Sequence, residues 1–212
     1  MNRVGPQRHN MLIGLICLCM IVLSAWSMWQ ERTVQQVQAG VDGAIYAPPP
    51  RLFIEQTDLP AGAPPRAYLL EALRIGTILS VHPNLPNRSA LLARAQFYIR
   101  EIEHVRPHWG EMWIVKAFLY SLSSPEFTAT ERDALIRSYL DAPYLHTTGR
   151  WRVLRSLGRW NALPPFVQDR VARETVWLYL TSSGPNPLLL LQAARESDGY
   201  IPVFRELRRA TR

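Results

Sequence analysis

The tetrapeptide His108-Trp109-Gly110-Glu111 holds the residues best suited to chemistry in this chain. A carboxylate beside an imidazole can transfer protons as a general acid–base pair. Glu111, however, follows the turn at Pro107 and lies in the first turn of an expected helix, where a negative charge suits the helix dipole. We therefore favour a structural role for this tetrapeptide and expect no catalytic residue in it.

Patterns for metal and phosphate binding are equally sparse. His104 and His108 are four residues apart, but Pro107 lies between them and interrupts a common helix. Cys17 and Cys19 both lie in an apolar N-terminal run, so the rest of the chain can hold no disulfide and no cysteine-based zinc site. No HExxH motif, phosphate-binding glycine loop or nucleophile elbow occurs. We expect no metal, no cofactor and no enzymatic activity.

A basic and aromatic segment at positions 149–160 is the feature most suggestive of binding. Helical spacing places Arg152, Arg155 and Arg159 on one face of this segment, and no acidic residue occurs from 142 to 168. One interpretation is an amphipathic helix with a solvated basic side. The alternative is a site for an anionic glycan, a lipid phosphate or an acidic partner. The predicted binding residues are Arg150, Trp151, Arg152, Arg155, Arg159 and Trp160.

The N-terminal part of the chain predicts a membrane anchor. Residues 11–29 carry no charge, and a helix of this length spans about 28 Å, close to the hydrocarbon thickness of a bilayer. Arg3 and Arg8 precede the run, so the positive-inside rule places residues 1–10 in the cytoplasm and the rest outside it. Trp26 and Trp29 lie where an interfacial aromatic belt is expected. The sequence thus predicts a single-pass inner-membrane protein with its C-terminal domain in the periplasm.

A cleaved signal peptide is the alternative for the same segment. Ala25-Trp26-Ser27 could serve as a cleavage site with small residues on either side of a bulky one. Both interpretations export the same domain. Residues 30–65 then form a proline-rich spacer, in which each proline favours extended backbone.

Residues 66–212 predict an all-α domain of about eight helices joined by short, proline-marked turns. Asn87 and Thr128 can cap the second and fourth helices, the latter through a capping box with Glu131. Neighbours joined by short turns tend to pack antiparallel, which favours an array of helical hairpins. The expected helices cover 66–81, 88–106, 109–123, 129–141, 149–160, 163–181, 188–197 and 202–211.

The turn between the second and third expected helices resembles the junction between tetratricopeptide repeats. That pattern has a closing proline followed by an aromatic, a small and a tyrosine residue at set offsets. Ala95, Pro107, Trp113, Ala117 and Tyr120 occupy these positions. A longer loop at 123–130 breaks the period, so the likeness is to a degenerate array of about 50 residues.

The phrase from Arg106 to Trp113, together with the anchor and the helical domain, resembles VpsP-like accessory proteins of bacterial exopolysaccharide gene clusters. That resemblance implies a scaffold of a polysaccharide synthesis or export complex in the inner membrane, acting through protein–protein contacts. The alternative function is a module outside the cytoplasm that binds anionic glycan or lipid through residues 149–160. The net charge of +7 suits either, and export excludes nucleic acid as a partner.

Overall fold

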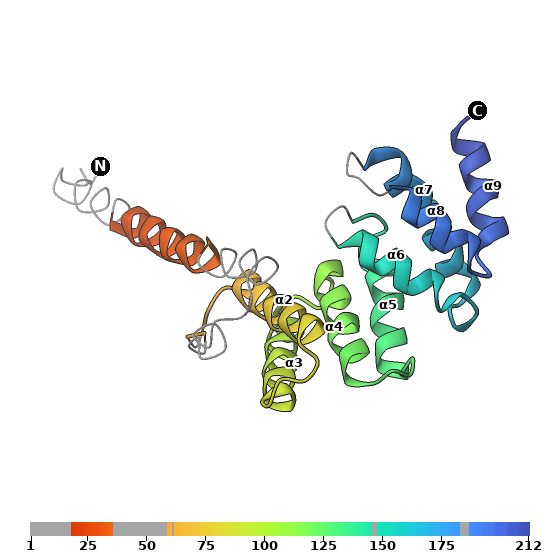
Figure 1. Ribbon diagram of the computed structural model, residues 1–212. Coiled ribbons are helices and arrows are strands. Elements are labelled where there is room, and N and C mark those ends of the chain that lie inside the picture. The colour runs from red at the N-terminus through yellow and green to blue at the C-terminus, as the bar shows by residue number, and fades with distance from the viewer. Residues whose placement is uncertain (1–17, 36–58, 61, 146–147, 183–186) are drawn as a thin grey trace, which may run out of the picture.

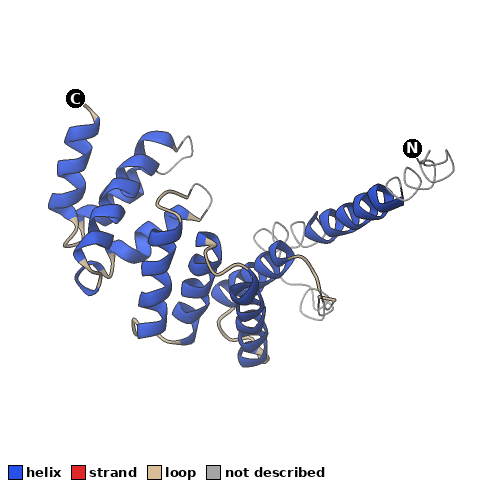
Figure 2. Cartoon of the chain, turned by 180° about the vertical axis from the view of Figure 1, so that it is seen from behind, coloured by secondary structure: helices blue, strands red, loops and turns tan. Residues whose placement is uncertain are grey.

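The computed structural model describes residues 18–35, 59–60, 62–145, 148–182 and 187–212. In these ranges the regular secondary structure is helical and no strand occurs (Figure 2). The predicted all-α fold class is therefore confirmed for the described part of the chain.

Residues 18–35 form a helix that lies at one end of the molecule, while α9 lies at the other end (Figure 1). Its apolar side chains are largely exposed, among them Ile21 at 65% and Leu23 at 64%. No helix in the described residues combines the length and the apolar character needed to cross a lipid bilayer. Residues 11–17 of the predicted span lie outside the described residues, as does most of the predicted spacer.

The eight predicted helices of the C-terminal domain occur in the expected order. They are α2 (Pro65–Val81), α3 (Arg88–Val105), α4 (Gly110–Ser123), α5 (Ala129–Asp141), α6 (Gly149–Leu157), α7 (Pro165–Thr181), α8 (Pro187–Arg195) and α9 (Tyr200–Ala210). The predicted fifth helix is too long, because α6 ends at Leu157 and a separate 3-10 turn, η2, covers Trp160–Ala162. The last helix starts two residues earlier than predicted, at Tyr200.

Local chemistry at the helix ends explains most of these boundaries. Pro65 and Pro165 stand in the first turns of α2 and α7, where a missing N–H costs nothing. Thr128 caps α5, since its Oγ1 accepts a hydrogen bond from the Glu131 N–H at 3.2 Å. The prediction that Asn87 caps α3 through its side chain is wrong, because that side chain makes no capping hydrogen bond.

The first six helices of the domain, α2 to α7, pair along the chain as hairpins. The closest pairs are α2 with α3 and α4 with α5, and α6 also packs on α7. Contacts between helices that are two apart in the chain order join the hairpins, notably α2 with α4, α6 with α8 and α7 with α9. The array therefore advances from α2 to α9 in the order of the sequence (Figure 1).

Two apolar clusters stabilise this array, and α5 contributes to both. The first cluster packs α2 to α5, with Ala134 and Leu135 as the α5 members. The second packs α5 to α9, with Tyr139 from the following turn of α5. Burying a side chain as large as Leu135 or Tyr139 contributes about 1.5–3 kcal/mol to stability. Since α5 buries such side chains in both clusters, it links the two halves of the domain into one packed unit.

Candidate functional site

The predicted binding segment 149–160 is not one continuous basic face. It comprises α6, the turn after it and the start of η2. Arg152 and Trp160 are buried, Arg155 and Arg159 are half-buried, and Arg150 is exposed. The prediction of a common solvated side for Arg152, Arg155 and Arg159 is wrong, and the reason lies in the partners that each arginine finds.

Arg152 is fully buried and all its N–H donors are engaged. Its Nε donates to Glu174 Oε2 at 2.9 Å, and its Nη2 donates to Glu174 Oε1 and to the Pro143 carbonyl, the latter at 3.4 Å. Its Nη1 donates to the carbonyl oxygens of Ser138 and Ala142, each at 2.8 Å. A guanidinium has five N–H donors, so none remains for a ligand.

The arginine contacts also satisfy the C-terminal end of α5. The last carbonyl groups of a helix lack partners within the helix and carry the negative end of its dipole. The guanidinium of Arg152 bonds the carbonyl oxygen of Ala142, the cap residue of α5, and shares the carbonyl oxygen of Ser138 with the Ala142 N–H. It also lies over the Tyr139 ring, with 4.0 Å from its Cζ to the ring centroid. Arg152 therefore ties α5, α6 and α7 together instead of offering charge to a ligand.

Glu174 supplies the balancing charge from α7. Its side chain has no exposed surface, and its Oε1 also accepts a hydrogen bond from the Leu145 N–H at 3.0 Å. Burial raises the pKa of the Glu174 carboxyl above its ordinary value, and the contact with Arg152 opposes that rise. Burial is the main cause that raises the pKa of the Tyr139 phenol, and the negative charge of Glu174 raises it further. This hydroxyl therefore keeps its proton at neutral pH.

Arg155 and Arg159 reach back toward the start of α5. Arg155 Nε donates to Glu131 Oε1 at 2.5 Å and its Nη2 donates to Glu131 Oε2 at 3.0 Å, and the glutamate side chain is buried. Arg159 Nη2 donates to the Pro125 carbonyl at 3.2 Å. Both guanidinium groups lie near the Phe127 ring, at 6.0 and 5.8 Å from its centroid. Arg155 therefore fastens α6 to the first turn of α5, and Arg159 fastens the turn after α6 to the loop before α5.

The two tryptophans of the segment pack against neighbouring helices. The Trp151 ring meets Phe118 of α4 edge to face, with 5.4 Å between ring centroids. Trp160 packs against Gly199, where a Cβ atom would come within 2.7 Å of the indole ring. Of the six predicted binding residues, only Arg150 is exposed, so the residues of this segment mainly hold helices together.

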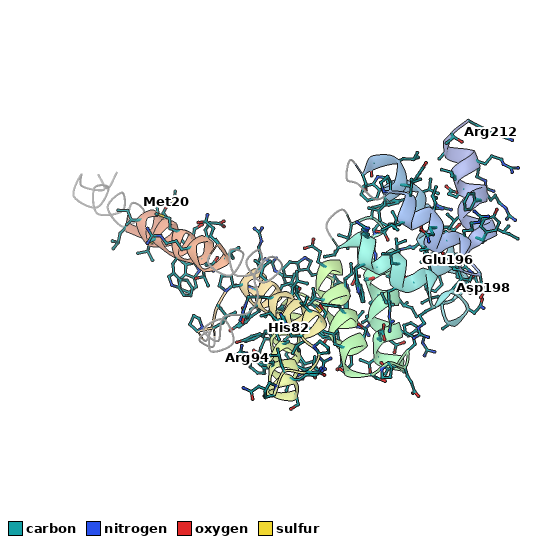
Figure 3. The ribbon with its side chains drawn as sticks, viewed as in Figure 1. Met20, His82, Arg94, Glu196, Asp198 and Arg212 are labelled. Atoms are coloured by element: carbon teal, nitrogen blue, oxygen red, sulfur yellow. The ribbon has the colours of Figure 1, made fainter. Side chains whose placement is uncertain are left out.

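An open cleft of about 530 Å³ lies beside Trp160, between η2 and the turn that joins α8 to α9. Arg159 and Trp160 are the two predicted binding residues that line it. Its acidic wall consists of Glu196 and Asp198, which lie on the same side of the molecule in Figure 3. Since the lining has two carboxylates and one arginine, the cleft does not fit the predicted anionic ligand.

The tetratricopeptide-like residues cluster around Trp113. The indole Nε1–H donates to the Pro107 carbonyl at 2.8 Å, which closes the turn between α3 and α4. The Lys116 ammonium and the Arg137 guanidinium each lie 4.7 Å from the Trp113 ring centroid. The other positions of the pattern differ in burial: Ala95 and Ala117 are fully buried, and Tyr120 is half-buried.

His108 and Glu111 of the tetrapeptide have structural surroundings at the turn between α3 and α4. His108 is 88% exposed, and its Nδ1 lies 3.3 Å from Asp141 Oδ1 at the end of α5. Glu111 lies in the first turn of α4, as predicted from the dipole argument. In the part of the chain that the structure describes, no group of three or more His, Cys, Asp or Glu side chains could hold a metal ion.

Sequence reasoning missed two acids, Glu131 and Glu174, as the ion-pair partners of the arginines in α6. Both are buried, and both pair with arginines of α6 that are more than 20 positions away. A signal for Glu174 was present in the sequence, because helical spacing places it on one face with the apolar residues Val167, Val171 and Leu178. An acid among buried positions implies a buried cation, since an isolated charge is costly to desolvate.

Comparisons with family models, with curated proteins and with solved structures give no significant match to this chain.

Proposed function

We propose that this protein is a membrane-anchored scaffold of a bacterial envelope complex for polysaccharide assembly or export, with no enzymatic activity of its own. The observation that carries the proposal is an array of helical hairpins joined to an apolar, exposed N-terminal helix. Hairpin arrays present extended surfaces to protein partners. The polysaccharide pathway comes from the VpsP-like resemblance of the sequence.

The internal use of the arginines supports a scaffold over a binding module. Arg152 and Arg155 each form a bidentate pair with a buried glutamate, and Arg159 holds a backbone carbonyl. These contacts stabilise the relative positions of α5, α6 and α7. A rigid array is what a scaffold requires, because partners are held at set positions along it.

The first hairpins support a degenerate tetratricopeptide-like arrangement, which is part of this proposal. In α3 and α4 the small residues Ala95 and Ala117 are fully buried, which lets the helices approach closely. Trp113 is 2% exposed and closes the turn through the Pro107 carbonyl. This is the packing role that the repeat pattern assigns to its small and aromatic positions.

The anchor rests on residues 18–29, which are uncharged and carry exposed Leu, Ile, Val, Met and Trp side chains. We propose that this helix, with the apolar residues before it, lies in the inner membrane and holds the array in the periplasm. Trp26 and Trp29, with 5.2 Å between ring centroids, suit the membrane interface. Arg3 and Arg8 support the orientation.

Anchoring is tested on the full chain by alkaline extraction of membranes. Val22→Arg should release the protein, since an arginine at the centre of a membrane helix costs about 2.5–3.5 kcal/mol for insertion. Gln35→Arg adds the same charge at an exposed position near the end of the same helix and should leave the protein in the membrane. Equal extraction of both variants would contradict the anchor.

The scaffold role is tested by crosslinking the full-length protein in its native membrane and purifying it through a C-terminal tag. Recovery of subunits that polymerise, flip or export polysaccharide supports the proposal. The matched control is the Val22→Arg variant, which should lose these partners while the folded array persists. Recovery of glycan or lipid alone, without a stoichiometric protein partner, would overturn the scaffold role.

A further inference from the structure

The outer face of α9 combines arginines with exposed apolar residues. Val203 of α9 is fully buried and packs into the second apolar cluster, with Leu207 against it. The opposite face carries Ile201, Arg205 and Arg208, at the i, i+4 and i+7 spacing of one helix face, and Arg212 follows two residues after the helix ends at Ala210. Ile201 is 63% exposed and the three arginines are exposed.

The charge on this face is not neutralised by the protein. Glu206 is the one acid of α9, and its carboxylate lies 3.4 Å from the guanidinium of Arg209, which stands one turn after Arg205. No ion pair in the described residues involves Arg205, Arg208 or Arg212. The helix dipole accounts for a cation in the last turn, but Arg205 lies a full turn earlier.

The apolar part of the face lies at the start of α9. Tyr200 is 44% exposed, and its ring contacts Phe204 with 4.7 Å between centroids. Arg212 stands at the far end of α9, away from Glu196 and Asp198 of the preceding turn (Figure 3). The helix therefore joins an exposed apolar and aromatic first turn to a run of cations, and such cations are attracted to anionic membrane surfaces.

We propose that the outer face of α9 docks on the anionic phospholipid surface of the membrane that holds the N-terminal helix. The arginines bind lipid phosphate groups, while Ile201 and Tyr200 enter the boundary between headgroups and acyl chains. This inference rests on the membrane anchor of the proposed function. Docking through α9 brings the C-terminal end of the array to the membrane and fixes which face is turned to partners.

The test uses the full chain in nanodiscs, with Cys17→Ser and Cys19→Ser, and with an environment-sensitive fluorophore on Ile201→Cys. Discs of phosphatidylcholine are compared with discs that contain about 30% phosphatidylglycerol. We expect a blue-shifted emission and protection from a soluble neutral quencher in the anionic discs alone. The shift should weaken at high salt, because exposed charges are screened.

The variant Arg205→Gln/Arg208→Gln/Arg212→Gln should abolish the shift. Each arginine near an anionic surface changes the ratio of docked to free states by about fivefold, so three change it by about 100-fold. The matched control is Arg66→Gln/Arg132→Gln/Arg150→Gln, which removes equal charge from other exposed positions and should keep the shift.

Three outcomes would overturn the proposal. A chain that stays in both discs without any shift refutes α9 docking and leaves the anchor intact. A chain that does not stay in the discs refutes the anchor, and with it the docking that depends on it. A shift produced equally by free anionic polysaccharide in phosphatidylcholine discs assigns the face to a glycan instead of lipid.

Discussion

Replacing Arg152 with methionine tests the central contact of the array. The substitution keeps most of the apolar volume but removes the charge and every donor of the guanidinium. Glu174 then stays buried without a cation, and the carbonyl oxygens of Ala142 and Pro143 lose their donors. Breaking one side of a buried ion pair costs about 3–5 kcal/mol, which is a large share of the 5–15 kcal/mol that stabilises a typical domain.

The loss should depend on pH. Without Arg152, the pKa of Glu174 rises further above its ordinary value of 4.5. At pH values between the ordinary pKa and this raised pKa, the folded variant binds more protons than its unfolded chain. The free energy of unfolding of the variant therefore falls as pH rises from about 4.5 toward the raised pKa. We expect Arg152→Met to be less destabilising at about pH 5 than at about pH 7.

Adding Glu174→Gln should rescue part of this loss. The double variant buries no charge at this site, so it should recover about 1–3 kcal/mol at neutral pH and lose the pH dependence of the single variant. The unpaired carbonyls at the end of α5 account for the loss that remains.

Urea unfolding of the full chain, followed by far-UV circular dichroism, measures each free energy of unfolding. Arg150→Met is the matched control, since this exposed neighbour should change stability by less than about 0.5 kcal/mol. The reasoning is refuted if Arg152→Met costs no more than Arg150→Met. It is also refuted if Glu174→Gln fails to restore stability to the single variant.

Two other substitutions test close packing in the first hairpins by the same unfolding assay. Gly110→Ala should destabilise by about 1–3 kcal/mol, because the new Cβ would overlap the Ala142 side chain. At Gly158 a Cβ would come no closer than 3.6 Å to the Leu154 carbonyl oxygen, which is an ordinary contact, so Gly158→Ala should be neutral or stabilise by up to about 1 kcal/mol. Equal effects of the two substitutions would contradict the packing argument. Trp113→Phe should cost about 1 kcal/mol through the lost hydrogen bond to the Pro107 carbonyl, and an unchanged unfolding midpoint would show that this bond does not close the turn.

Short-range patterns were sufficient to predict the helices of this protein. Apolar residues recur at helical spacing, and prolines mark most turns, so each helix could be located without reference to its neighbours. Errors occurred where a local signal was ambiguous. The fifth helix was extended through Gly158 to Trp160, although the glycine ends it and Trp160 begins a separate turn.

The role of the α6 arginines was decided only by tertiary structure. Helical spacing predicted one face for Arg152, Arg155 and Arg159, but α6 ends at Leu157, so Arg159 lies beyond the helix, and the prediction that this face is solvated did not hold. Whether an arginine face meets water or a buried acid depends on which helices pack against it. Glu131 and Glu174 come from α5 and α7, on either side of α6 in the chain.

The sequence by itself thus determined the helical class and the order of the helices, because both depend on residues within a few positions of one another. The tertiary structure decided which charges are internal. A buried ion pair requires two side chains from different helices to meet at hydrogen-bonding distance, and helical spacing contains no information about that meeting. For the same reason, the free basic face of α9 could be separated from the engaged arginines of α6 only after the helices were placed together.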